Sequence, residues 1–225
     1  MKKLSVDVWS DVMCPWCAVG WTQFSKAMRE VEDEIEVTAR FMPFELNPDL
    51  PPEGKDQQKH LSEVYRRSAE EVAAMRAQLH AAADRAGFPM AWDGEGEEPA
   101  AMMWNTFDAH KLLRWALAEA GPEAQARLKV ALLEAHFQRR RNVSDREVLL
   151  ELAETQGFDR ARAAAALDDE ALAIAVRAEE QRGRQVGINS VPSFVVDGKY
   201  LIQGARDPAE YASMLRQIAG QVQNA

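Results

Sequence analysis

The sequence has only two cysteines among its 225 residues, and they lie three positions apart as Cys14 and Cys17. Domains held together by disulfides use more cysteines and join distant segments with them. The N-terminus also lacks the apolar core of a signal peptide, because Asp7 and Asp11 interrupt the first apolar stretch. We therefore expect the two thiols to serve a local purpose, and we expect a cytoplasmic protein.

Long apolar runs and an excess of positive charge are both missing. No uninterrupted apolar segment approaches the ~20 residues that cross a bilayer. The 27 lysines and arginines are outnumbered by 36 aspartates and glutamates, so the formal net charge is −9. Such a chain repels phosphate backbones and anionic lipid unless its basic residues form one patch, and the basic run at 139–141 is short. We expect neither a nucleic acid nor a membrane as partner.

The sequence also lacks a metal-ligand pattern. Structural zinc usually takes four ligands, but there is no second cysteine pair. The four histidines are scattered through the middle of the chain at 60, 80, 110 and 136. We predict no metal site. Two incidental core cysteines and a static disulfide remain alternatives to a reactive pair.

Hydrophobic periodicity divides the chain into a β-rich start, a helical middle and a β-rich end. Near the start, residues 4–9 alternate as in a strand, a helix follows from Cys14, and 35–41 form a second strand. After a proline-rich segment, helical patterns continue for about 130 residues. Possible capping boxes at 68–71 and 144–147 mark the starts of two of these helices. Further helices are expected from about Met103 to Gly121, from Pro122 onward and over 168–185.

The last forty residues return to β signals. Two short strands, 193–196 and 200–203, flank the hairpin turn Asp197-Gly198, and Pro208 opens an amphipathic helix. The order predicts an α/β fold, namely a thioredoxin-like core with a large all-helical insertion. Residues 1–49 and 186–225 would form the discontinuous thioredoxin-like domain, and 50–185 would form the inserted helical domain.

The spacing of the cysteines predicts disulfide exchange, which needs a thiolate that attacks and a second thiol that resolves the mixed disulfide. Cys14 stands at a helix start, where free backbone N–H groups and the helix dipole favour a thiolate, and Pro15 suits the first turn. Cys17 lies one turn further in. We therefore expect a lowered pKa for Cys14 and not for Cys17.

A second signal is Ser190-Val191-Pro192-Ser193, which directly precedes a late strand. In a thioredoxin-like core, an X-Pro bond at this point is expected to be cis and to lie against the attacking sulfur. An ordinary trans proline at a strand entry is the alternative.

Four segments carry a family resemblance: residues 10–17 (SDVMCPWC), 44–48 (FELNP), 105–110 (NTFDAH) and 191–194 (VPSF). Together they resemble the DsbA family, and specifically its FrnE-like branch. The resemblance implies a thioredoxin fold with a helical insertion, Cys14 as nucleophile, Cys17 as resolving thiol and Pro192 as the cis-proline. Trp16 departs from the periplasmic members, which have histidine there.

These observations predict an enzyme that reduces or isomerises protein disulfides. Phe44, Trp104, Asn105 and His110 are candidates for a substrate groove, with core packing as the alternative for each. We expect disulfide-containing proteins or small thiols as substrates, no tightly bound cofactor, glutathione as a candidate electron donor, and a monomer or homodimer. One alternative is a small-molecule enzyme resembling kappa-class glutathione transferases or hydroxychromene-carboxylate isomerases. Another is a non-catalytic binding or chaperone module.

Overall fold

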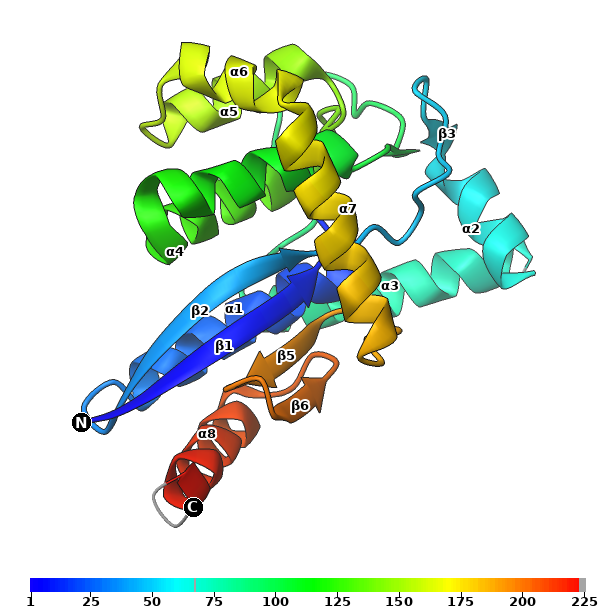
Figure 1. The fold of residues 1–225 in the computed structure, drawn as a ribbon. Helices are drawn as coiled ribbons and strands as arrows, with labels where there is room; N and C mark the ends of the chain where they lie inside the picture. Colours follow the sequence, from blue (N-terminus) through cyan, green and yellow to red (C-terminus); the bar gives the residue numbers. More distant parts are fainter. Residues whose placement is uncertain (67, 223–225) are drawn as a thin grey trace.

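The computed structural model describes residues 1–66 and 68–222, and a four-stranded mixed sheet lies at its centre (Figure 1). The strand order is β2-β1-β5-β6. Strands β1 (Lys2–Ser10) and β2 (Ile35–Pro43) run parallel, whereas β5 (Ser193–Val196) pairs antiparallel with both β1 and β6 (Tyr200–Gln203). The two ends of the chain therefore build one sheet, as the sequence predicts.

Helices α1 (Pro15–Glu30) and α8 (Pro208–Val222) cover one face of this sheet. Their apolar side chains pack against the alternating residues 4, 6 and 8 of β1. Phe24 of α1 stacks on Phe194 of β5 at 4.6 Å between ring centroids and meets Tyr211 of α8 edge-on at 5.1 Å. This cluster attaches α1, and therefore the cysteine pair at its start, to the sheet.

The segment between β2 and β5 is predominantly helical. It contains α2 (Gln57–Tyr65), α3 (Ala69–Ala86), α4 (Phe107–Phe137), α5 (Arg146–Thr155), α6 (Arg160–Asp168) and α7 (Glu170–Gln185). In Figure 1, α4, α5 and α6 form a group on the side of the sheet away from α8, and they share a core of their own. Strands β3 (Lys55–Asp56) and β4 (Met102–Met103) pair antiparallel, so the insertion is not entirely helical. Two-residue strands are too short to produce an alternating pattern.

Two insertion helices pack directly on the sheet. Gln125 of α4 accepts a hydrogen bond from the Phe41 backbone N–H at 2.7 Å and donates one to the Phe41 carbonyl at 3.0 Å. The amide thus pairs with the edge strand β2 as a neighbouring strand would. On the other face of β1, α7 lies so close to Trp9 that a Cβ at Gly183 would be 2.4 Å from the indole ring.

Several predicted helix ends are confirmed and others are wrong. Ser68 and Glu71 form the expected capping box, and α4 is interrupted at Gly121, whose φ is 82°. The second predicted box fails, because Asp145 rather than Ser144 caps α5. Helix α7 begins at Glu170, after its N-cap residue Asp169. Helix α4 begins at Phe107 rather than near Met103, because residues 102–103 form β4 and pair with the distant strand β3.

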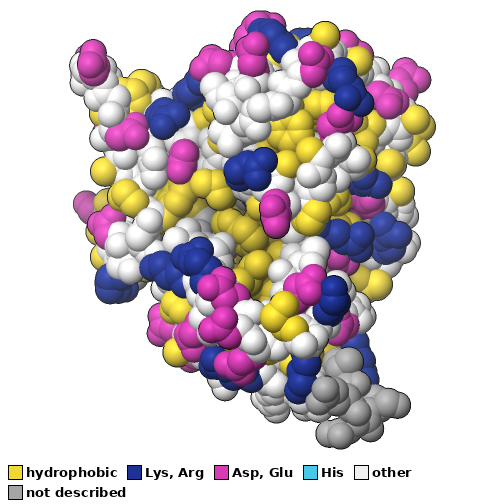
Figure 2. Space-filling view, turned by 90° about the vertical axis from the view of Figure 1, so that its left-hand side faces the viewer, with side chains coloured by type: hydrophobic (Ala, Val, Ile, Leu, Met, Phe, Trp, Pro, Cys, Tyr) yellow, Lys and Arg dark blue, Asp and Glu magenta, His cyan; other side chains and the backbone are white. Residues whose placement is uncertain are grey.

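No helix within residues 1–66 and 68–222 is long and apolar enough to cross a membrane. Figure 2 shows basic and acidic side chains interspersed over one face of the molecule. That face therefore offers no segregated basic patch for a polyanion.

Candidate active site

Cys14 caps the N-terminus of α1. Its φ and ψ are −85° and 111°, and its carbonyl accepts the first helical hydrogen bonds, from Cys17 N at 3.0 Å and Ala18 N at 3.3 Å. Pro15 follows at a first-turn position, where a missing N–H costs no bond. Both cysteines are free thiols, with only 4% of Cys14 and 1% of Cys17 exposed. The pair is therefore close to the surface but largely covered.

The loop before β5 provides the cover. The Val191–Pro192 peptide bond is cis, the isomer that the sequence predicts. Cys14 Sγ lies 3.7 Å from the Val191 carbonyl oxygen and donates to it. A Cβ added to Gly20 of α1 would be 2.8 Å from Pro192 Cγ, so only glycine allows the helix and this loop to come so close. The loop containing Pro192 is thus seated directly on the cysteine helix.

The pKa of each cysteine is shifted in the direction opposite to the prediction. The hydrogen bond to Cys17, burial and the nearby negative charge raise the pKa of Cys14 well above its ordinary value. Burial also acts to raise the pKa of Cys17, but hydrogen bonds from Cys14 and Ser10 and the positive charge of Lys129 outweigh it and lower that pKa. The pair should lose its first proton below the ordinary cysteine pKa and its second well above it.

A buried acid lies directly before the pair. Asp11 is fully buried, and its Oδ2 accepts a hydrogen bond from Leu46 N at 2.8 Å. Its Oδ1 is 3.5 Å from Nε2 of the buried His110. Burial alone would raise the pKa of Asp11, but His110, the Leu46 N–H and Lys129 hold it below its usual range. The carboxylate therefore remains charged beneath the site.

A buried lysine, Lys129 of α4, was missed by sequence reasoning. Its side chain is 0% exposed, and Nζ donates to the Ser10 carbonyl oxygen at 3.3 Å. Burial lowers its pKa to about 8, while the nearby cysteines and Asp11 act in the opposite direction. The available signal was its position inside the apolar run Leu128-Lys129-Val130-Ala131-Leu132, where a lysine on an apolar helix face has to find a buried partner.

A groove of about 440 Å³ opens beside Cys14, between the α1 start, the Val191 loop and helices α2 and α3. Large apolar side chains are exposed along it, including Trp16, Val64, Tyr65 and Met75. None of its described lining residues is an aspartate or glutamate, although the chain has 36 of them, and Arg76 contributes a positive charge. The groove suits an apolar ligand that is neutral or anionic.

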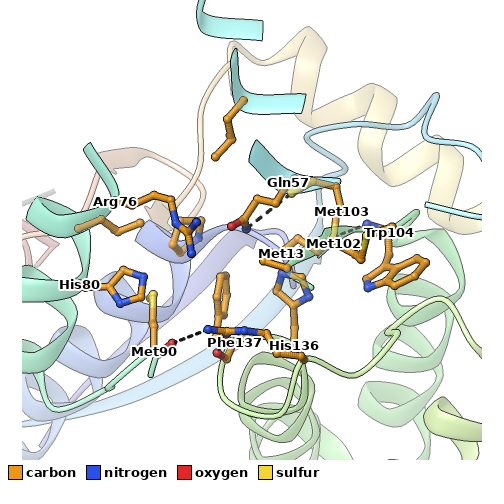
Figure 3. A pocket seen from close by; sticks show the side chains of 15 residues that line it. Met13, Gln57, Arg76, His80, Met90, Met102, Met103, Trp104, His136 and Phe137 are labelled. Carbon is orange, nitrogen blue, oxygen red and sulfur yellow. Dashed lines mark hydrogen bonds between the residues drawn. The ribbon is translucent and has the colours of Figure 1, made fainter. Parts of the chain in front are cut away.

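A smaller cavity of about 90 Å³ adjoins the groove and shares Met13, Arg76 and Met103 with it. Figure 3 shows Arg76 and His80 of α3 on one side of this cavity and Met102, Met103 and Trp104 on the other. Trp104 N donates to Met13 Sδ at 2.9 Å, which attaches this strand segment to the residue before Cys14.

Of the four residues predicted for a substrate groove, Trp104 lines the smaller cavity. The other three lie elsewhere. Phe44 packs in a buried cluster with Trp9, Met42 and Ile188, and Asn105 donates to the Pro48 carbonyl at 3.1 Å. His110 is buried against Asp11. The groove is instead formed largely by α2 and α3, whose lining residues follow no recognisable motif.

No group of three or more His, Cys, Asp or Glu side chains in the described part of the chain is arranged to hold a metal ion.

Residues 5–216 match the family of DSBA-like thioredoxin domains, and the chain belongs to this family. Among solved structures, the probable DsbA oxidoreductase SCO1869 from Streptomyces coelicolor is 32% identical, with a TM-score of 0.82 over 96% of this chain and 90% of that one. The resemblance to the DsbA family is thereby confirmed, and so is the thioredoxin fold with a helical insertion.

Two more distant structures share the fold alone. The cytosolic disulfide reductase DsbM from Pseudomonas aeruginosa, solved with GSH, has a TM-score of 0.61 at 20% identity, over 95% of this chain and 98% of that one. A 2-hydroxychromene-2-carboxylate isomerase has a TM-score of 0.66 at 15% identity, over 98% and 97%.

Proposed function

We propose that the protein is a thiol–disulfide oxidoreductase that reduces or isomerises protein disulfides through Cys14 and Cys17. The observation that carries this proposal is the position of Cys14, which caps α1, touches the Val191 carbonyl and lines the apolar groove. A substrate disulfide in that groove would meet Cys14 before the more deeply buried Cys17. Cys14 is therefore the attacking thiol and Cys17 the resolving thiol.

In this mechanism the Cys14 sulfur attacks one sulfur of the substrate disulfide, and the other substrate sulfur leaves as a thiolate. Cys17 then attacks Cys14 Sγ, which releases the second substrate thiol and leaves a Cys14–Cys17 disulfide. Pro15 and Trp16 hold the spacing of the pair, while Val191 and Pro192 cover the mixed disulfide from the other side. Glutathione would return the protein to the dithiol form, and no tightly bound cofactor is required.

The groove indicates the kind of substrate. Its exposed apolar side chains, its Arg76 and its lack of carboxylates favour an unfolded protein segment with apolar and acidic residues around the disulfide. We further propose a cytoplasmic protein, since only two cysteines are used and the DsbM fold relative is described as cytosolic. The FrnE-like branch, the domain limits at 49/50 and 185/186, and a monomeric or homodimeric state remain our predictions.

Turnover of insulin disulfides with glutathione as the reductant tests the proposal. We expect catalysis by the wild-type protein and background rates for Cys14→Ser. Wild-type rates no higher than those of glutathione alone would contradict the proposed function.

The hydroxychromene-carboxylate isomerase fold relative keeps a small-molecule activity as the second candidate. That candidate predicts glutathione conjugation or isomerisation of an aromatic substrate that persists in Cys17→Ser. Disulfide exchange instead requires Cys17 for release of the substrate, so this single variant separates the two functions.

A further inference from the structure

The smaller cavity beside the cysteine site collects basic and imidazole side chains from two helices. Arg76 and His80 come from α3, whereas His136 lies near the end of α4 and Arg140 follows it. Figure 3 shows Arg76 and His80 entering from one side, with the His136 ring across the cavity. None of the described lining residues is an aspartate or glutamate. The cavity therefore offers donors and positive charge without an anion of its own.

The two arginines of the cavity differ in their partners. Arg140 is already compensated, because it pairs with Glu98 at 2.7 Å and also donates to the backbone carbonyls of Phe137 and Met90. Arg76 is half-buried and makes no hydrogen bond or ion pair with the described residues. One positive charge at the cavity is thus free to bind a ligand.

The side chain of His136 is a second, independent sign that a polar ligand binds here. It is only 5% exposed, and its Nδ1 has no hydrogen-bond partner within the described residues. Buried polar atoms are nearly always hydrogen-bonded, because an unmade bond costs free energy. Burial keeps the ring neutral at pH 7, so one of its nitrogens carries a hydrogen that it can donate. A ligand oxygen in the cavity would accept it.

The size and position of the cavity define where such a ligand comes from. Its volume is about 90 Å³, whereas a single water needs about 10–15 Å³, so a group of several heavy atoms fits. The cavity shares Met13 and Pro15 with the apolar groove, and these two residues flank Cys14. A group held in the cavity therefore belongs to the molecule whose sulfur meets Cys14.

We propose that this cavity is a specificity pocket for a carboxylate, namely an aspartate or glutamate side chain close to the reacting cysteine of a protein substrate. The inference rests on the proposed function, since it names a feature of the substrate of the same site. Arg76 pairs with the carboxylate, and the His136 ring donates a hydrogen bond to it. Both residues contact the substrate and act on its binding rather than on the sulfur chemistry.

Glutathione also carries carboxylates, but the groove favours a longer chain as the occupant. Beyond the cavity it exposes the apolar side chains of Trp16, Val64, Tyr65 and Met75. A tripeptide without large apolar side chains leaves these uncovered, whereas an unfolded protein segment covers them and places an acidic residue in the cavity.

The test uses matched pairs of peptide disulfides. Each peptide has one cysteine among leucines and serines, and the members of a pair differ by glutamate or glutamine at one position near the cysteine. The value of kcat/KM for their reduction by glutathione is measured at pH 7 with wild type, Arg76→Gln, Arg76→Lys and Arg85→Gln. Arg85 is the matched control, because it is an exposed arginine on the same helix α3 but does not line the cavity.

We expect the wild-type protein to reduce the glutamate peptide about tenfold faster than its glutamine partner at one or more positions, mainly through a lower KM. This factor corresponds to about one hydrogen bond between charged groups. Arg76→Gln should bring the ratio close to one. Arg76→Lys should keep part of the preference, and Arg85→Gln should keep all of it.

Equal wild-type rates for glutamate and glutamine at every position overturn the inference while the proposed function stands, and this comparison needs no variant to fold. A preference that survives in Arg76→Gln also overturns it, because the carboxylate then binds elsewhere. If Arg76→Gln instead slows only the reduction of the oxidised protein by glutathione, the occupant is glutathione and the inference is wrong. A wild-type protein that reduces none of the peptides overturns the proposed function as well.

Discussion

Acid should destabilise this protein through one buried histidine, His136 of α4. Its side chain is 5% exposed, its Nδ1 has no hydrogen-bond partner within the described residues, and its ring meets Phe137 edge-on at 4.6 Å. Burial, assisted by the Arg140 charge and opposed by that of Asp11, lowers the pKa of His136 to about 4. The folded protein therefore holds the neutral imidazole, whereas the unfolded chain binds a proton near pH 6.5.

The linkage between proton binding and folding gives the direction of this pH effect. Because the folded pKa is depressed, this stabilisation of the folded state is complete above about pH 6.5 and is lost as the pH falls toward 4. The pKa of His136 differs between about 6.5 in the unfolded chain and about 4 in the folded protein. At about 1.36 kcal/mol for each pKa unit, this difference corresponds to about 3 kcal/mol of folding free energy. His136→Leu removes the titrating group and should remove this part of the acid sensitivity.

Urea unfolding at pH 7 and pH 4 measures how much of the free energy of unfolding each protein loses in acid. We expect the free energy of unfolding of the wild-type protein to fall by about 3 kcal/mol more than that of His136→Leu over this range. His80→Leu serves as the control, because His80 is only partly buried and should contribute less. Equal acid losses in the wild-type and His136→Leu proteins would refute the reasoning.

Three further predictions concern the surroundings of the cysteines. Gly20→Ala should lower the free energy of unfolding by about 1–2 kcal/mol, because the added Cβ would be 2.8 Å from Pro192 Cγ. Gly220→Ala is the control: its added Cβ would have no atom within 4 Å, so thermal melting should show a neutral or stabilising effect. Asp11→Asn should cost about 1–3 kcal/mol at pH 7. That cost should shrink at acid pH, because the lowered pKa of Asp11 stabilises the folded state only while the carboxylate is charged. Because Trp16 carries no charge, we expect a reduction potential between about −120 and −270 mV in glutathione equilibration. A value at or above about −130 mV would instead indicate a strong oxidase.

The fold could be predicted where local chemistry decides it. The Asp197-Gly198 turn was predictable because Asp-Gly tolerates the positive φ that a two-residue hairpin turn requires. Both residues adopt positive φ, at 50° and 65°. The strand pattern of β1 and the interruption at Gly121 were predictable for similar reasons. In contrast, β3 and β4 depend on a partner nearly fifty residues away, and two residues have no periodicity to detect.

The electrostatics of the site could not be predicted from the motif. Local reasoning assigned a lowered pKa to Cys14 from the helix start alone. That reasoning omitted the cover of the Val191 loop, 177 residues away, which buries Cys14. It also omitted Lys129, which reaches the end of β1 from the insertion and whose positive charge acts to lower the pKa of Cys17. Burial and charge at this site come from segments brought together only by folding.

Trapping of mixed disulfides tests the central claim most directly. Cys17→Ser should accumulate a covalent complex between Cys14 and a disulfide substrate, because the resolving sulfur is missing. Cys14→Ser should trap none, because the remaining thiol of Cys17 is only 1% exposed. The complexes are separated without reductant, and mass spectrometry of their peptides identifies the linked cysteine. A complex that forms through Cys17 in Cys14→Ser, or full insulin reduction by both variants, would contradict the assignment of Cys14 as the attacking thiol.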